Sequence, residues 1–235
     1  MIFVQTNTIT RLRLPENEQE NVKVIEYNSI HDDMFQHSSS YNDDLQYGIL
    51  ECDLTLVNEA ISYGADVNHV DDYTKETPLF LALTSTLEIF DFLVQHGADV
   101  HARNKSDNTL LHKACEYEYA DIVSYLLDKK INVNAVDNIG KTPLLNALYA
   151  YMTDKKKLEN IVEKLIQNGA NVNVQDDYEH NTALHLACDQ NAIEIVKILV
   201  KEGADLQVRN YEKQTAYDIA MKHGYDTIAC FLREN

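Results

Sequence analysis

Residues 182–206 read TALHLACDQNAIEIVKILVKEGADL, and apolar side chains recur in this segment at helical spacing. They would line one face of each of two short helices, at Leu184, Ala187 and Cys188 and then at Ile195, Val196 and Leu199. Thr182 precedes the first helix and belongs to the residue types that cap helix N-termini. Gly203 follows the second helix and can adopt the left-handed conformation that ends one. The segment therefore predicts a hairpin of two amphipathic helices.

The same pattern recurs along most of the chain. The threonine that starts each first helix returns at intervals of 32, 33, 40 and 33 residues, at Thr77, Thr109, Thr142, Thr182 and Thr215. The position that ends each second helix is held by Gly64, Gly97, Lys130, Gly169 and Gly203. An apolar pair, such as Ile195-Val196, stands eight residues before each of these positions. Three markers in one register indicate an internal repeat. Neither helix is long enough to bury its apolar side alone, so we expect the hairpins to stack.

The segments DNIGKTPL (137–144) and TALHLA (182–187) resemble the ankyrin repeat, and the resemblance covers about residues 43–235. It implies an all-α fold, an ankyrin-repeat solenoid of stacked helical hairpins joined by short β-hairpin-like loops. It also implies six repeats, the first degenerate and the last a C-terminal cap. Their predicted bounds are 43–70, 71–103, 104–136, 137–175, 176–208 and 209–235.

Several residues depart from the repeat pattern. Asp43 takes the threonine position of repeat 1, where we expect its carboxylate to cap the first helix, and Gly48 replaces a small alanine there. Lys130 takes a glycine position, which should cost roughly 1 kcal/mol. Residues 71–73 and 176–178 both read Asp-Asp-Tyr at a hairpin tip, so we expect these two tips to look alike.

Repeat 4 carries about six extra residues, 152–157, which include Lys155-Lys156-Lys157. Longer helices or a bulged turn should result. One interpretation is a solvated insertion between helices, and the other is a dedicated basic contact in an otherwise acidic protein. The sequence leaves both open.

Residues 1–42 do not fit the repeat and form a predicted N-terminal extension of mixed or uncertain structure. Their apolar content is too high for a simple disordered tail, and we expect them to cover the open end of the solenoid. Residues 8–14 are strand-like, whereas Pro15-Glu16 is typical of a helix start.

The charge of the chain limits its partners. It holds 38 acidic and 20 basic residues, a formal net charge of -18, which would repel nucleic acid and anionic lipid surfaces. No apolar run approaches the roughly 20 residues of a spanning helix, and residues 1–14 lack the pattern of a secretory signal. We therefore expect a cytoplasmic protein, or one in a host cytoplasm if it is delivered there.

Candidate reactive residues do not form a convergent set. The cysteines, Cys52, Cys115, Cys188 and Cys230, are 63, 73 and 42 residues apart, which is no zinc or redox spacing, and we expect them to be reduced and buried. His112 and His185 hold equivalent positions, at which the family uses histidine to brace neighbouring backbone. The sequence predicts no catalytic, cofactor-binding or metal-binding residue. An enzyme with its site in residues 1–42 is the alternative of another class.

A stacked solenoid offers its partners a large open face more readily than a deep pocket. In this family the contacts come from the hairpin tips and the ends of the first helices. The residues predicted to bind a partner on this concave face are Tyr73, Glu76, Glu116, Tyr117, Ile139, Tyr149, Tyr178, Asp189 and Tyr211. Tyrosine is enriched at interface hot spots, although the chain also holds fourteen tyrosines in all, and high tyrosine content is the alternative explanation.

These observations favour a non-catalytic protein-protein interaction module that is monomeric when free. Its acidic, tyrosine-rich face would complement a folded protein with a basic or mixed surface. The resemblance is compatible with an adaptor or with an effector directed at a host. A stoichiometric inhibitor or immunity protein of a basic enzyme is a narrower alternative, and homotypic assembly through the same face is another.

Overall fold

The structure, a computed structural model, describes residues 40–150 and 154–235, and residues 41–235 form one compact unit. The described part contains α-helices, one 3₁₀ helix (η1) and no strand. Their bounds are α2 (Tyr41–Leu50), α3 (Leu54–Ser62), α4 (Pro78–Leu81), η1 (Ala82–Thr84), α5 (Leu87–Gln95), α6 (Leu110–Glu116), α7 (Ala120–Asp128), α8 (Pro143–Tyr149), α9 (Lys155–Gln167), α10 (Ala183–Asp189), α11 (Ile193–Lys201), α12 (Ala216–His223) and α13 (Asp226–Glu234). The predicted cap in residues 1–42 lies, as far as residue 39, outside the described residues.

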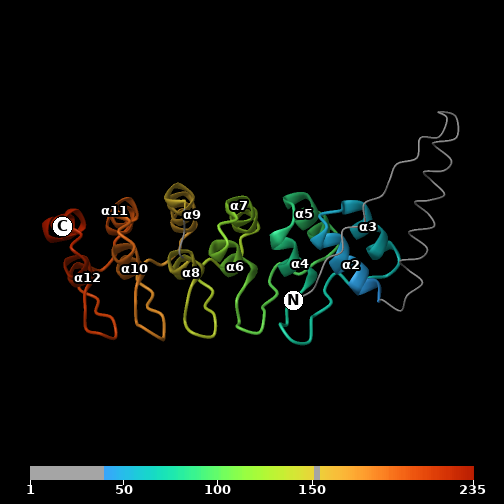
Figure 1. The fold of residues 1–235 in the computed structure, drawn as a ribbon, viewed down its shortest axis with the longest axis horizontal. Helices are drawn as coiled ribbons and strands as arrows, with labels where there is room; N and C mark the ends of the chain where they lie inside the picture. Colours follow the sequence, from blue (N-terminus) through green and yellow to red (C-terminus); the bar gives the residue numbers. More distant parts are fainter. Residues whose placement is uncertain (1–39, 151–153) are drawn as a thin grey trace, which may run out of the picture. The chain divides into compact units, whose positions relative to one another are not determined.

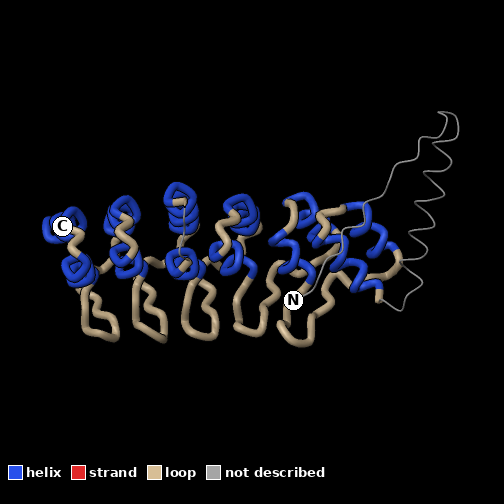
Figure 2. The backbone as a smooth tube through the Cα atoms, viewed as in Figure 1, coloured by secondary structure: helices blue, strands red, loops and turns tan. Residues whose placement is uncertain are grey.

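The helices pair as six hairpins, from α2 with α3 to α12 with α13. Figure 1 shows α6, α8, α10 and α12 in one row and α7, α9 and α11 in a second row. The loops between hairpins project from the row of first helices (Figure 2). Leucines such as Leu111, Leu144 and Leu184 are at most 1% exposed between neighbouring hairpins, and burying each contributes about 2 kcal/mol. The predicted all-α solenoid of stacked hairpins with hairpin-like loops is confirmed.

The threonines precede the first helices as predicted, but not all of them cap through the hydroxyl. The hydroxyl of Thr142 accepts a hydrogen bond from the Leu145 N–H at 3.3 Å, which satisfies a free backbone donor of α8. Thr77 makes no such bond, and its Oγ1 is buried without a partner among the described residues. In that repeat the Phe80 N–H donates instead to the Thr77 carbonyl oxygen at 2.9 Å. The first turn of the four-residue α4 is therefore held by backbone hydrogen bonds alone.

Lys130 adopts the conformation that its position requires. Its φ is 57°, in the left-handed region where Gly97 and Gly169 also lie, and its N–H donates to the Leu127 carbonyl oxygen at 2.9 Å. A side chain at positive φ crowds the neighbouring carbonyl oxygen. The predicted local strain in repeat 3 is thus present in the backbone.

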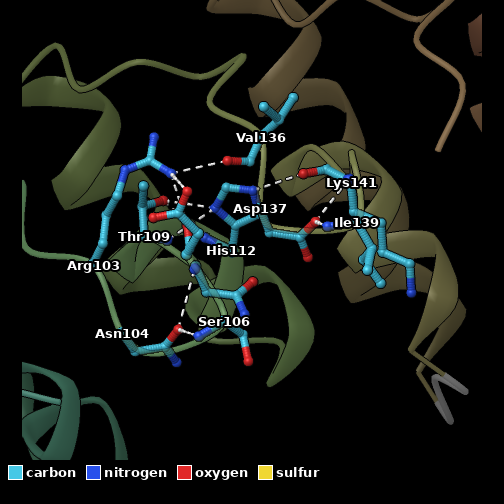
Figure 3. A network of polar contacts seen from close by, with 11 residues as sticks. Arg103, Asn104, Ser106, Thr109, His112, Val136, Asp137, Ile139 and Lys141 are labelled. Atoms are coloured by element: carbon cyan, nitrogen blue, oxygen red, sulfur yellow. Dashed lines mark hydrogen bonds and ion pairs between the residues drawn. The ribbon is translucent and has the colours of Figure 1, made fainter. Parts of the chain in front are cut away.

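His112 ties its hairpin to the next one (Figure 3). Its Nδ1 accepts from the Thr109 N–H at 3.1 Å, so the proton lies on Nε2, which donates to the Lys141 carbonyl oxygen at 3.0 Å. His185 repeats this arrangement with Thr182 and with the Gln214 carbonyl oxygen. Both imidazoles are buried, and burial lowers the pKa of each below its usual value. The predicted bracing role of the two histidines is confirmed.

Asparagine side chains link the turns that follow the second helices. Asn134 donates from Nδ2 to the Gly169 carbonyl oxygen at 2.8 Å and accepts at Oδ1 from the Asn171 N–H at 2.7 Å. Asn68 and Asn173 make the same pair of bonds to their following repeats. Each amide satisfies two backbone groups that would otherwise face outward at a turn. Neighbouring repeats are therefore held in register on this side as well.

Repeat 1 begins differently from the prediction. Helix α2 starts at Tyr41, so Asp43 lies inside its first turn and the prediction that it caps the helix is wrong. Asp53 does cap α3, with Oδ1 accepting from the Thr55 and Leu56 N–H groups. A Cβ at Gly48 would lie 2.9 Å from the Val57 backbone nitrogen. Only glycine lets α2 and α3 approach this closely.

The insertion in repeat 4 lengthens a helix. Helix α9 has thirteen residues, whereas α7 and α11 have nine each. Asp154 caps it by accepting from the Lys156 and Lys157 N–H groups. The prediction of a longer helix is confirmed, and residues 152 and 153 lie outside the described residues.

The cysteines divide into two kinds. Cys115 and Cys188 are buried, as predicted, and burial raises the pKa of both thiols, that of Cys188 to about 12. Cys52 and Cys230 are exposed, so the prediction of burial is wrong for them. Cys52 lies in the turn between α2 and α3 with a positive φ, and Cys230 lies on α13 beside the buried Ala229 but on its outer side.

Replacing Lys130 by glycine should stabilise the chain. Glycine adopts the left-handed conformation without a Cβ clash, so we expect Lys130→Gly to raise the free energy of unfolding by about 1 kcal/mol in urea titrations. The control is Lys129→Gly, because Lys129 has φ −75°, so that glycine there relieves no strain. It loosens the unfolded chain and removes the contact of the Lys129 Nζ with the Tyr125 ring. A stabilisation of equal size in both variants would contradict the explanation.

The two buried histidines should make stability depend on pH. Because their folded-state pKa is lowered, their contribution is complete above the unfolded-state pKa of about 6.5 and is lost as pH falls through the folded value. We expect His112→Gln/His185→Gln to be less stable than the parent at pH 7.5 but to lose less stability between pH 7 and 5. Urea unfolding at each pH measures this. The control variant His69→Gln/His101→Gln replaces two exposed histidines instead, and equal slopes in all three proteins would contradict the assignment.

Candidate functional site

A groove of about 770 Å³ crosses repeats 4 to 6. We call it the C-terminal groove. It is lined by the ends of α8, α10 and α12 and by the tips of the last two loops. The predicted residues Tyr149, Tyr178, Asp189 and Tyr211 all lie in its lining. The structure thus brings four of the nine predicted site residues together.

The tip that carries Tyr178 is built by Asp176. The carboxylate of Asp176 accepts backbone N–H groups of Tyr178 at 2.9 Å and Glu179 at 2.7 Å through Oδ1, and of Asn181 at 3.0 Å through Oδ2. Such a turn fixes the backbone and directs the tyrosine outward. The side chain of Tyr178 is 77% exposed. Its ring therefore stands in solvent on a rigid support.

The tip of repeat 2 has the same construction. Asp71 accepts the N–H groups of Tyr73 at 3.0 Å and Thr74 at 2.7 Å, and these bonds hold the pKa of its carboxyl below the usual value. Lys75, at the position of His180, likewise has a positive φ. The prediction that the two Asp-Asp-Tyr tips look alike is confirmed.

Backbone hydrogen bonds join each tip to the next. They run from Lys105 N to Thr74 O, Asn138 N to Ser106 O, Asp177 N to Ile139 O and Tyr211 N to Glu179 O, at 2.8 to 3.1 Å. Tyr211 is 77% exposed, like Tyr178, and its ring centroid lies 6.5 Å from that of His180. The tip residues of repeats 2 to 6 therefore form one continuous edge. We call the side of the array that carries these tips and the ends of the first helices the groove side.

Tyr149 differs from the other predicted tyrosines because it is half-buried. Its hydroxyl donates to Asp176 Oδ2 at 2.9 Å, below the tip that Asp176 organises. Burial raises the pKa of this hydroxyl well above its usual value, and the neighbouring Asp176 carboxylate also favours the protonated form. The Lys141 Nζ lies 3.7 Å from its ring centroid. Tyr149 supports the floor of the groove and presents only part of its ring.

Charged side chains line the groove around these rings. Asp189 pairs with His223 at 3.1 Å, and the His223 ring stacks on Tyr225. Glu212 pairs with Lys222 at 3.5 Å. Both pairs are well exposed, so they are weak and rearrange at little cost. The lining of the groove is acidic and aromatic on balance.

The other five predicted residues lie outside this groove, on repeats 2 to 4. Tyr73 is 79% exposed, Tyr117 44% and Ile139 40%. Glu76 accepts from Asn104 Nδ2 at 3.0 Å, and Glu116 pairs with Lys113 at 2.9 Å. That these five residues, and the four in the groove, bind a partner remains a prediction.

The lining also holds polar residues that are not among the nine predicted ones. They include Glu179 and Glu212, which follow the exposed tip tyrosines, and Lys222 and His223 at the end of α12. His223 stands eight residues after Thr215, in the position that Tyr117 occupies after Thr109. The register of the repeat therefore already places it at the exposed end of a first helix.

Other kinds of site are not evident where the structure describes the chain. No group of three or more side chains suited to hold a metal ion occurs within residues 40–150 and 154–235. Among the helices in these ranges, none combines the length and apolar character needed to cross a membrane.

The chain is similar to several known proteins. It is 27% identical over 210 residues to the nuclear factor NF-kappa-B p105 subunit of Gallus gallus, across 84% of this chain and 21% of that protein. It is 31% identical over 133 residues to the B-cell lymphoma 3 protein homolog of Mus musculus, across 56% and 28%. The chain thus spans less than a third of either relative.

A solved structure supports the fold. The crystal structure of the ankyrin repeat domain of Bcl-3, a member of the IkappaB protein family, aligns with a TM-score of 0.68 and 24% identity, over 81% of this chain and 85% of that one. The family model for ankyrin repeats, in three copies, matches residues 45–137, 85–154 and 148–235. With this match over most of its length, the chain belongs to the ankyrin repeat family.

Proposed function

We propose that this chain is a non-catalytic protein-interaction module that binds a folded protein through its groove side. The observation that carries the proposal is the pair Tyr178 and Tyr211, both 77% exposed at the edge of the C-terminal groove. An exposed tyrosine gives a large contact area at a small cost in side-chain entropy. Two such rings on rigid tips are therefore well placed for a partner to cover them.

The net charge of the chain indicates which sign of charge a partner's surface should carry. The net charge of -18 speeds association with a cationic surface and slows association with an anionic one. The acids along the groove side, including Glu179 and Asp189, lie beside the tyrosines. A protein with a basic or mixed surface is the natural complement. A stoichiometric inhibitor of a basic enzyme is a narrower form of the same proposal, favoured by this acidity.

Several finer statements stay predictions. They include a cytoplasmic location, a monomeric state when free, and a role as adaptor or as host-directed effector. An enzyme site within residues 1–42 lies almost wholly outside the described residues, and deleting that segment tests it. Loss of a turnover activity from a chain that stays folded would revive the enzyme alternative.

Removing the exposed rings should weaken partner binding strongly. We expect affinity capture with the full chain to recover a 1:1 complex that weakens when salt rises from 0.05 to 0.5 M. The variant Tyr73→Ala/Tyr117→Ala/Tyr178→Ala/Tyr211→Ala should weaken it at least about thirty-fold, because hot-spot residues carry most of the binding energy. Tyr149 is left in place because its hydroxyl supports Asp176.

Tyr47→Ala is the matched control, since Tyr47 is 46% exposed on α2 and lies outside the groove lining. It should bind as the parent does. An equal loss in the control, or full affinity in the fourfold variant, would remove the groove side from consideration. A molecular mass that rises with concentration in light scattering would favour homotypic assembly instead.

A further inference from the structure

The tyrosines of the groove side differ in what covers their rings. Lysines of the chain itself lie over three of them, with Nζ 4.7 Å from the ring centroid at Tyr73, 4.8 Å at Tyr117 and 3.7 Å at Tyr149. A cation at this distance is attracted by the negative face of the ring. Within the described residues, neither Tyr178 nor Tyr211 has such a lysine. Two exposed rings in repeats 5 and 6 thus lack the cation that their counterparts have.

Carboxylates line the same groove as these two rings. Glu179 and Glu212 directly follow Tyr178 and Tyr211 in the tips, and Asp189 lies at the end of α10. All three line the C-terminal groove, whereas Lys222 is its one lysine. Lys222 is paired with Glu212 at 3.5 Å. Because both side chains are exposed, this pair is weak, and a cation of a partner can replace Lys222. The surroundings of the two rings therefore favour positive charge.

The two rings are also held in place before any ligand arrives. Asp176 fixes the tip of Tyr178 through three backbone hydrogen bonds. The Tyr211 N–H donates to the Glu179 carbonyl oxygen at 2.8 Å, which ties the next tip to it. Little backbone freedom is lost when a ligand binds to such a preorganised site.

We infer that the C-terminal groove binds an arginine side chain of a partner protein, with the guanidinium against the faces of Tyr178 and Tyr211 and near the carboxylates of Glu179, Glu212 and Asp189. This inference rests on the proposed function and assigns its recognition to repeats 5 and 6. Arginine fits better than lysine for two reasons. A planar guanidinium stacks on aromatic rings, and its fork of N–H donors matches a carboxylate, whereas an ammonium does neither.

The test compares two peptides of equal charge. Fluorescein-labelled tetra-arginine and tetra-lysine are titrated with the full chain, and fluorescence anisotropy gives both dissociation constants at 0.05 M salt and pH 7.5. General attraction to an acidic protein affects the two peptides alike. Stacking and forked hydrogen bonding affect only tetra-arginine, so we expect it to bind about five-fold or more tightly.

Three variants locate the preference for arginine. In Tyr178→Ala/Tyr211→Ala the ratio of the two dissociation constants should fall towards one. Asp189→Asn should weaken both peptides, because it removes charge, while part of the ratio remains. Tyr73→Ala is the matched control, since it removes an equally exposed ring on an equivalent tip that Lys105 already covers, and it should leave the ratio unchanged.

The inference is overturned if the parent chain binds neither peptide or shows no preference, or if Tyr73→Ala reduces the preference as much as the double variant does. Circular dichroism of each variant confirms that the solenoid is intact. The proposed function fails separately, when the fourfold tyrosine variant still captures the partner. If a captured partner binds Tyr178→Ala/Tyr211→Ala as tightly as it binds the parent chain, the proposed interaction module is retained and the arginine site is ruled out.

Discussion

The constraint on which this structure depends is that no hairpin can bury its own apolar face. Helices of seven to nine residues are too short to be stable in isolation, so each hairpin needs a neighbour to cover residues such as Leu144 and Leu184. The stacking must also be in register, and polar contacts between repeats provide that register. His112 reaches the Lys141 carbonyl oxygen and Asn134 reaches that of Gly169. A repeat is thus stable only as part of the array.

This constraint leaves one side of the array free for function. Stacking uses the inner faces of both helices, whereas the exposed side chains of the hairpin tips take no part in the core. Side chains there, such as Tyr178 and Tyr211, are exposed and can be changed with little cost to the fold, while Asp176 keeps the backbone beneath Tyr178 fixed. Rigid support and free choice of side chain together are what a binding surface needs.

The repeat markers are local, and for that reason most of the fold was predictable. A threonine cap, a left-handed terminal residue and a helical apolar pair act within a few residues, so even Lys130 at positive φ followed from its position. The errors arose where the outcome depends on a particular neighbourhood. Asp43 lies inside a helix that begins earlier than the repeat pattern indicates, and Cys52 and Cys230 lie on outward sides that the pattern does not distinguish. The gathering of four site residues into one groove needed the coordinates.

Net charge and local pairing have different consequences for recognition on this surface. The charge of -18 acts over roughly a Debye length, about 10 Å at 0.1 M salt, and so affects the rate of encounter along the whole groove side. The pairing of a ring with a cation acts only in contact and affects how long a complex lasts. At Tyr73, Tyr117 and Tyr149 a lysine of the chain itself already makes the cation–π contact with the ring. A chain with this net charge can therefore attract a cationic partner along the whole groove side and still retain it chiefly at repeats 5 and 6.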